Sequence, residues 1–106
     1  MLSAPISCSS SGDNQIIAGV TGRRIRVCGY VLSGGGNVAA KWRSATTDKT
    51  GLLNVSVVNP FTVGMPSLGG IGEPFGWFDC ATGEALNLNL SGAVAVGGHV
   101  LYELVP

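Results

Sequence analysis

The sequence predicts an all-β domain with the strand density of a sandwich or a barrel. No stretch of eleven or more residues places apolar side chains at helical spacing. Short alternating or β-branched runs recur instead, and turn-forming residues separate them. About eight strands in a chain of 106 residues is the density expected of two packed sheets or a closed β fold. A chain of this length holds a single domain, residues 1–106.

The predicted strands are separated by glycine-containing turns. Glycine and asparagine tolerate positive φ, so residues 11–14, 21–22, 34–37 and 82–83 are predicted to be turns. The strands between and around these turns are predicted at residues 3–9, 14–20, 23–32, 38–44, 49–57, 74–80, 85–90 and 99–105.

Two of these strands show a clear alternation. Leu86, Leu88 and Leu90 alternate with two asparagines, which predicts a half-buried strand with the leucines on the core face. Residues 23–32 alternate as well. Their predicted core face is Ile25, Val27, Gly29 and Val31, and their predicted outer face, toward solvent or a partner, is Arg24, Arg26, Cys28 and Tyr30.

The chain is apolar and weakly charged for a small domain. Hydrophobic residues make up 45% and charged residues 11%, and six basic residues balance six acidic ones. A zero net charge removes the electrostatic footprint that a nucleic-acid binder or a membrane-surface protein needs. Small monomeric proteins depend on surface charge to remain soluble and to avoid association with one another. The composition therefore predicts a homo-oligomer or a body attached to a larger assembly.

Neither of the two longest uncharged stretches, residues 51–72 and 85–102, is predicted to span a membrane, because asparagine, proline and glycine interrupt both. The first twelve residues lack the basic and apolar regions of a signal peptide. This predicts a chain kept in a cytoplasm unless a leader has been removed.

The polar residues show no catalytic or metal-binding spacing. Cys8, Cys28 and Cys80 form no CxxC or Cys/His pair and are predicted to be reduced and mostly buried, with one disulfide left open if the protein ends outside a cell. His99 is the single histidine and has no partner at triad spacing, and the acidic residues are scattered singly. We therefore predict no enzyme, no cofactor and no metal.

Residues 73–90, EPFGWFDCATGEALNLNL, followed by VAVGG at 94–98, form one extended pattern, and residues 22–27, 30–32 and 38–44 continue it over most of the chain. This pattern resembles small virion proteins of tailed bacteriophages. The resemblance implies a jelly-roll β-sandwich and a capsid decoration (cement) protein, on the capsid exterior and assembled in the host bacterial cytoplasm. Residues 62–71 and Cys80 depart from the pattern. The partner contacts that the resemblance implies are therefore least transferable to this chain at these residues.

The resemblance also implies partners. These are the major capsid protein and other copies of the chain, with a trimer favoured over a dimer. Residues 59–72 are uncharged but carry several apolar side chains, so this loop is expected either to fold over its own sandwich or to dock on a neighbour. Together with an N-terminal arm at residues 1–5, it supplies the predicted interface residues Met1, Leu2, Pro5, Phe61, Met65 and Leu68.

Three aromatic residues leave a second class of function open. Trp42, Trp77 and Tyr102 could stack on a sugar in a receptor- or carbohydrate-binding module of a phage fibre or tail. Core or interface packing is the favoured role of the two tryptophans.

Overall fold

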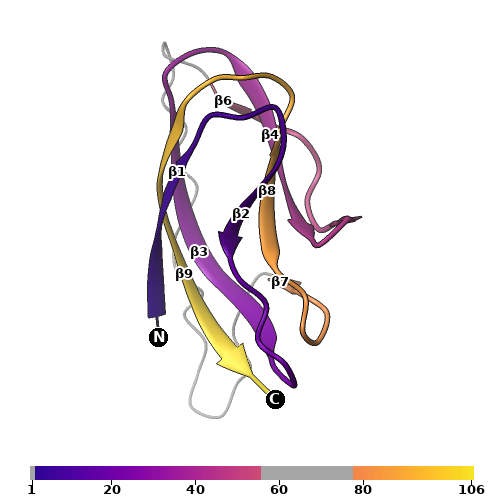
Figure 1. The fold of residues 1–106 in the computed structure, drawn as a ribbon. Helices are drawn as coiled ribbons and strands as arrows, with labels where there is room; N and C mark the ends of the chain where they lie inside the picture. Colours follow the sequence, from indigo (N-terminus) through magenta and orange to yellow (C-terminus); the bar gives the residue numbers. More distant parts are fainter. Residues whose placement is uncertain (1, 56–77) are drawn as a thin grey trace.

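The computed structural model describes residues 2–55 and 78–106, and every helix or strand assigned in these two ranges is a β-strand (Figure 1). The predicted all-β class is confirmed. In the same two ranges, no helix has the length and apolar character needed to cross a membrane. The strands are β1 (Leu2–Cys8), β2 (Gly12–Ile17), β3 (Arg24–Gly34), β4 (Val38–Ser44), β5 (Thr47–Asp48), β6 (Leu53–Val55), β7 (Phe78–Asp79), β8 (Leu86–Leu90) and β9 (Val96–Val105).

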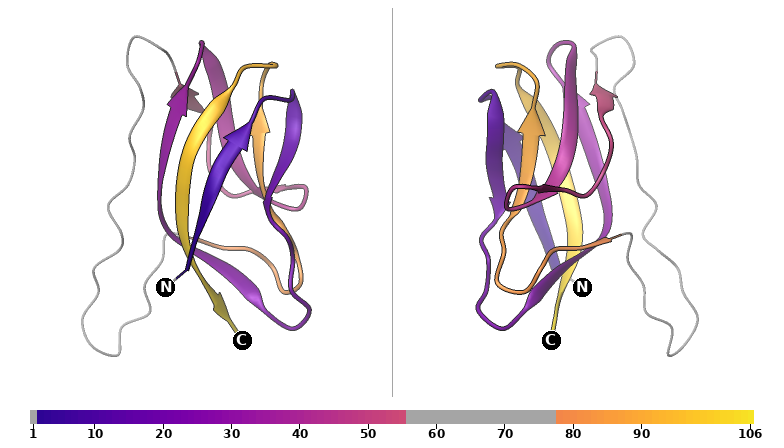
Figure 2. Two further views of the ribbon diagram at one scale, coloured as in Figure 1. Left: turned by 60° about the vertical axis from the view of Figure 1, so that its left-hand side comes forward. Right: turned by 90° about the vertical axis from the view of Figure 1, so that its right-hand side faces the viewer.

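The described strands form two antiparallel sheets that face each other (Figure 2). The first sheet has the order β1-β9-β3-β7, and the second has the order β2-β8-β4-β5, with β6 also paired to β4. Successive strands β1 to β4 alternate between the sheets, and in each sheet a strand from the C-terminal half lies between two from the N-terminal half. This is the strand order of a jelly roll, with β5 as an addition, so the predicted sandwich is confirmed.

The core lies between the two sheets. On β8, Leu86, Leu88 and Leu90 are at most 1% exposed, as the alternation predicts. Beside them in the same sheet, the Trp42 indole of β4 packs edge-on against the Tyr30 ring of β3 in the first sheet, with 5.2 Å between ring centroids. The aligned inner faces of both sheets therefore share one hydrophobic core.

A β-bulge in β3 changes which of its side chains face inward. The pairing of β3 with β9 shifts between Val27 and Gly29, so Cys28 is an extra residue on β3. Because one extra residue reverses the alternation, Tyr30 and Leu32 enter the core and Val31 lies on the outer side, half-buried. The prediction that Tyr30 shares a face with Arg24 and Arg26 is therefore wrong.

Two β-turns at the lower end of the sandwich have the same hydrogen bond and the same glycine position. The Arg23 N–H donates to the Val20 carbonyl at 3.0 Å, and the Glu84 N–H donates to the Ala81 carbonyl at 3.0 Å. Gly22 and Gly83, the third residues of these turns, have φ of 78° and 80°, as type II turns require. Both turns were predicted from their glycines.

Several strand boundaries differ from the prediction. Residues 2–5, expected as an arm, are paired with β9 as the first part of β1. Within the described residues, the strand expected at 49–57 covers only Leu53–Val55, and Thr47–Asp48 forms β5 through a tight hairpin with β4. The last strand starts at Val96 rather than His99, because Gly97 and Gly98 continue the ladder.

Candidate functional site

The outer face of the second sheet carries charged and polar side chains that form ion pairs and hydrogen bonds with one another. Arg43 of β4 lies 3.0 Å from an Asp13 carboxylate oxygen on β2 and 2.9 Å from Asp48 on β5. Lys41 lies 3.1 Å from Asp48, and the Asn89 amide donates to Asp13 at 2.8 Å. The Asn89 hydrogen bond, with the nearby Arg43, lowers the pKa of Asp13. These charges compensate one another within the face.

The outer face of the first sheet is different. Ile6 of β1 and Val100 of β9 are buried on the core side, so the odd-numbered residues around them face outward. No acidic or basic residue other than a histidine lies in three successive cross-strand rows, which we call the uncharged strip. The rows, each across β1, β9 and β3, are Ser7–Gly97–Ser33, Pro5–His99–Val31 and Ser3–Leu101–Gly29.

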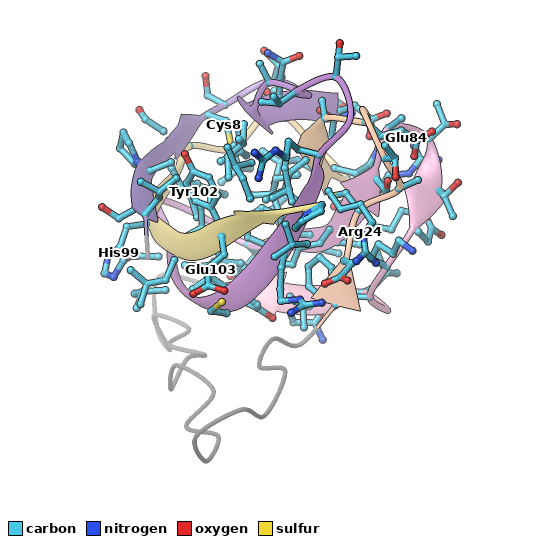
Figure 3. The ribbon with its side chains drawn as sticks, turned by 90° about the horizontal axis from the view of Figure 1, so that it is seen from below. Cys8, Arg24, Glu84, His99, Tyr102 and Glu103 are labelled. Atoms are coloured by element: carbon cyan, nitrogen blue, oxygen red, sulfur yellow. The ribbon has the colours of Figure 1, made fainter. Side chains whose placement is uncertain are left out.

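The middle of the uncharged strip is accessible. Pro5 and His99 are exposed, and the His99 side chain points away from the sandwich (Figure 3). Leu101 and Val31 flank His99 and are half-buried. The strip therefore combines apolar side chains with hydroxyls and one imidazole, which is a surface that loses little hydration energy when a partner covers it.

A charged cluster bounds the strip at its lower end. Asp79 of β7 accepts from Arg26 Nε at 2.8 Å and from Arg24 Nη1 at 3.1 Å. The Arg26 hydrogen bond lowers the pKa of Asp79, and the same bond raises the pKa of Arg26. Glu103 pairs with Arg26 in the β3–β9 register. This cluster joins β7 to β3 and keeps its charges satisfied.

An open hollow of about 450 Å³ lies at the opposite end of the strip. Gly97, which has no side chain, contributes to it. The Cys8 thiol is the one ionisable side chain among the lining residues, and burial raises the pKa of this thiol, so it stays protonated at neutral pH. The hollow can offer hydrogen bonds and shape but no acid–base pair. Its described lining is Ser7, Cys8, Ser9, Ser33, Gly34, Gly35, Ala95, Val96 and Gly97.

The predicted interface residues are only partly described. Leu2 is 47% exposed at the start of β1, and Pro5 is exposed in the middle of that strand. The remaining four, as well as the loop 59–72, lie outside the described residues. These four are Met1, Phe61, Met65 and Leu68.

The aromatic residues proposed for sugar stacking are not arranged as a platform in the described part of the chain. Trp42 is 0% exposed and packs on Tyr30, which is the core role that was favoured for it. Tyr102 is half-buried and packs against the core. Trp77 lies outside the described residues.

The cysteines and other possible ligands do not gather. Cys28 and Cys80 are buried, Cys8 is half-buried, and none of the three is joined to another. Burial raises the pKa of all three thiols. No group of three or more His, Cys, Asp or Glu side chains close enough to hold a metal ion occurs in residues 2–55 and 78–106.

Sequence reasoning missed Val31 and Leu101 as members of the outer strip. Val31 was assigned to the core because the bulge at Cys28 is invisible in a simple alternation. Leu101 becomes part of the strip only through its pairing with Ser3 and Gly29, which lie far away in the sequence. The local sequence has no signal for either.

Comparison of the chain with protein families, with curated proteins and with solved structures finds no match. What the protein does must therefore be inferred from its own residues and geometry.

Proposed function

We propose that the protein is a structural, non-enzymatic component of a bacteriophage virion, a decoration protein that binds across junctions between capsid subunits. The observation that supports this most is the contrast between the two outer faces. The charges of the second sheet compensate one another at hydrogen-bonding distance, whereas the uncharged strip of the first sheet offers Pro5, Val31 and Leu101 around an exposed His99. The low overall charge and the resemblance of residues 73–98 support the same function.

The physical basis is burial of apolar area. A decoration protein needs no chemistry, because each contact that it makes to two capsomers raises the free energy needed to separate them. Each Å² of apolar surface removed from water contributes about 25 cal/mol. A strip without charged side chains can be covered without the cost of desolvating ions. The strip is therefore the described surface best suited to dock on a protein shell.

The proposed partners are the major capsid protein and two further copies of this chain. Pro5 would contact them from within the strip and the exposed Leu2 from the start of the same strand, with Met1, Phe61, Met65 and Leu68 contributing as predicted from the sequence. The trimer is checked by light scattering on the purified chain, which should give three times the chain mass of 10.8 kDa. A monomer that stays a monomer at high concentration would contradict the trimer in solution but would leave assembly on the shell to be measured.

Binding to the shell is tested with two matched variants. His99→Asp places a carboxylate in the middle of the strip, and Gln15→Asp places one at an exposed position of β2 on the outer face of the second sheet. Both are measured in sedimentation with capsids assembled from the major capsid protein encoded in the same genome. An unpaired charge covered by a partner weakens binding, so His99→Asp should reduce affinity by at least about tenfold. Gln15→Asp should bind like the parent.

Two results would contradict the proposal. If the parent chain does not sediment with capsids at all, the decoration function is wrong. If it does bind but His99→Asp and Gln15→Asp bind equally well, the strip is not the docking surface. Circular dichroism of both variants shows that neither result comes from unfolding.

A further inference from the structure

Among the described strands, β1 lies at the edge of the first sheet, and the backbone hydrogen-bonding groups on one of its sides have no described partner. In the described residues it pairs only with β9, and its seven residues are LSAPISC, which carry no charge. Exposed edges of this kind can pair with another chain, and proteins usually prevent this with charged side chains, bulges or proline. The β1–β9 register is unbroken from Leu2 to Cys8, so no bulge protects β1. Pro5 is its one protective residue.

The position of Pro5 in the ladder fixes which groups face the free edge. Residues of an antiparallel strand bond alternately to the two sides. Pro5 is opposite His99 and has no N–H, yet the pairing continues through Ile6 and Gly98. The bonds to β9 must therefore come from the even-numbered residues. It follows that Ser3, Pro5 and Ser7 direct their backbone groups to the free edge.

We propose that the β1 edge is a latent pairing surface for a second copy of this chain, and that Pro5 keeps it closed. A two-fold axis would place the two β1 strands antiparallel and in full overlap, with Ser3 opposite Ser7 and Pro5 opposite Pro5. Both Ser3–Ser7 pairs have their donors and acceptors. The central pair has no donor, and its two proline rings occupy the space between the strands. The missing bonds lie at the centre of the contact, where they weaken it most.

Other features of β1 favour a second copy as the occupant. The strand has no charge that would repel its own copy, and two-fold pairing makes the same short sequence complementary to itself. The side chains next to Pro5 on the outward side are serines, which are small and exposed. Pairing of two such edges would join two first sheets into one continuous sheet. This inference is independent of capsid binding, because it concerns the chain alone, and it requires only that the contacts of the proposed trimer leave the β1 edge free.

The first variant restores the backbone N–H donor at position 5, and a double variant then places a proline at another position of the same edge. Pro5→Thr supplies the missing N–H, and Ser7→Thr is the matched control, because it adds the same side chain at an exposed edge position without changing the donors. The double variant Pro5→Thr/Ser7→Pro returns a proline to the free edge. Light scattering measures the native mass of each over a range of concentrations. We expect at least twice the parent mass for Pro5→Thr and the parent mass for the other two.

A parent mass for Pro5→Thr at all concentrations, with an intact circular dichroism spectrum, would overturn the proposal. A doubled mass for Ser7→Thr would also overturn it, because strand propensity and not the donor would then control pairing. Hydrogen exchange is measured on the parent chain, so this second test does not depend on the folding of any variant. Corrected for intrinsic rates, the amides of Ser3 and Ser7 should exchange at least about tenfold faster than those of Ala4 and Ile6. Equal protection would show that the edge is already occupied.

Discussion

Replacing Gly98 by alanine is the sharpest test of how closely β9 approaches β3. Gly98 lies in the middle of the first sheet, opposite Ile6 on one side and Leu32 on the other. Its φ is 143°, and a Cβ built on it would lie 1.8 Å from the Val31 carbonyl oxygen and 2.8 Å from the Val31 carbonyl carbon. Both neighbouring atoms belong to the backbone, so a rotamer change cannot relieve the contact.

The expected cost follows from two contributions. A positive φ on a residue with a Cβ costs about 1 to 2 kcal/mol. Separating β9 from β3 at this point weakens one or two ladder hydrogen bonds, each contributing about 0.5 to 1.5 kcal/mol. Gly98→Ala should therefore lower the free energy of unfolding by about 1.5 to 5 kcal/mol, which lowers Tm by at least roughly 6 °C for a domain of this size.

Gly97 is the matched control. It is the neighbouring residue of the same strand, but a Cβ there would meet only the Ile6 carbonyl oxygen at 3.7 Å, an ordinary contact. Gly97→Ala should change the free energy of unfolding by no more than about 0.5 kcal/mol, since alanine also restricts the unfolded chain. Urea denaturation followed by circular dichroism measures both variants. If Gly98→Ala loses no more stability than Gly97→Ala, the close approach of β9 to β3 is not a constraint on the fold.

Three further changes test other parts of the structure. Because the Arg26 bond lowers the pKa of Asp79, this carboxylate contributes stability that is present above its unfolded pKa and is lost as the pH falls. Asp79→Asn should lose about 1 kcal/mol at pH 7, and this difference from the parent should shrink as the pH falls through the folded pKa of Asp79 in urea titrations, whereas a constant difference would contradict the ion pair. Ala45 has a φ of 51°, so Ala45→Gly should raise the free energy of unfolding by about 0.5 to 1 kcal/mol, and a lower urea midpoint would show that no strain is relieved. Trp77→Phe leaves Trp42 as the one tryptophan, whose 0% exposure predicts blue-shifted fluorescence that acrylamide hardly quenches until the chain is unfolded. Quenching as strong in the folded as in the unfolded variant would place Trp42 outside the core.

Local patterns were enough to predict the class of fold and its clearest strand. The alternation on β8 identifies Leu86, Leu88 and Leu90 as core residues because the side-chain period of a strand is two. The turns at Gly22 and Gly83 were predicted because their conformations are rare for residues with a Cβ. Both signals depend only on neighbouring residues.

The remaining features depend on pairing between distant segments. The bulge at Cys28 is defined by the position of β9, so no count along β3 can locate it, and Tyr30 was therefore placed on the wrong face. The Arg43–Asp13 ion pair joins residues 30 positions apart, and the strip acquires Leu101 through its register with β1. A candidate site built across three strands cannot be read from any one of them.

The place of β9 between β1 and β3 affects how the chain can fold as it is synthesised. The ten residues of β9 leave the ribosome after all the other described strands, yet they supply the strand to which both β1 and β3 bond. Until they emerge, β1 lacks the one strand with which it pairs in the described residues, and the long-range pairing that remains is slow to form. Early termination of translation would thus remove the middle of a sheet rather than its margin. Leu2 is opposite Tyr102, and both chain ends lie at the same end of the sandwich (Figure 1), so a fused tag at either end would project from that end.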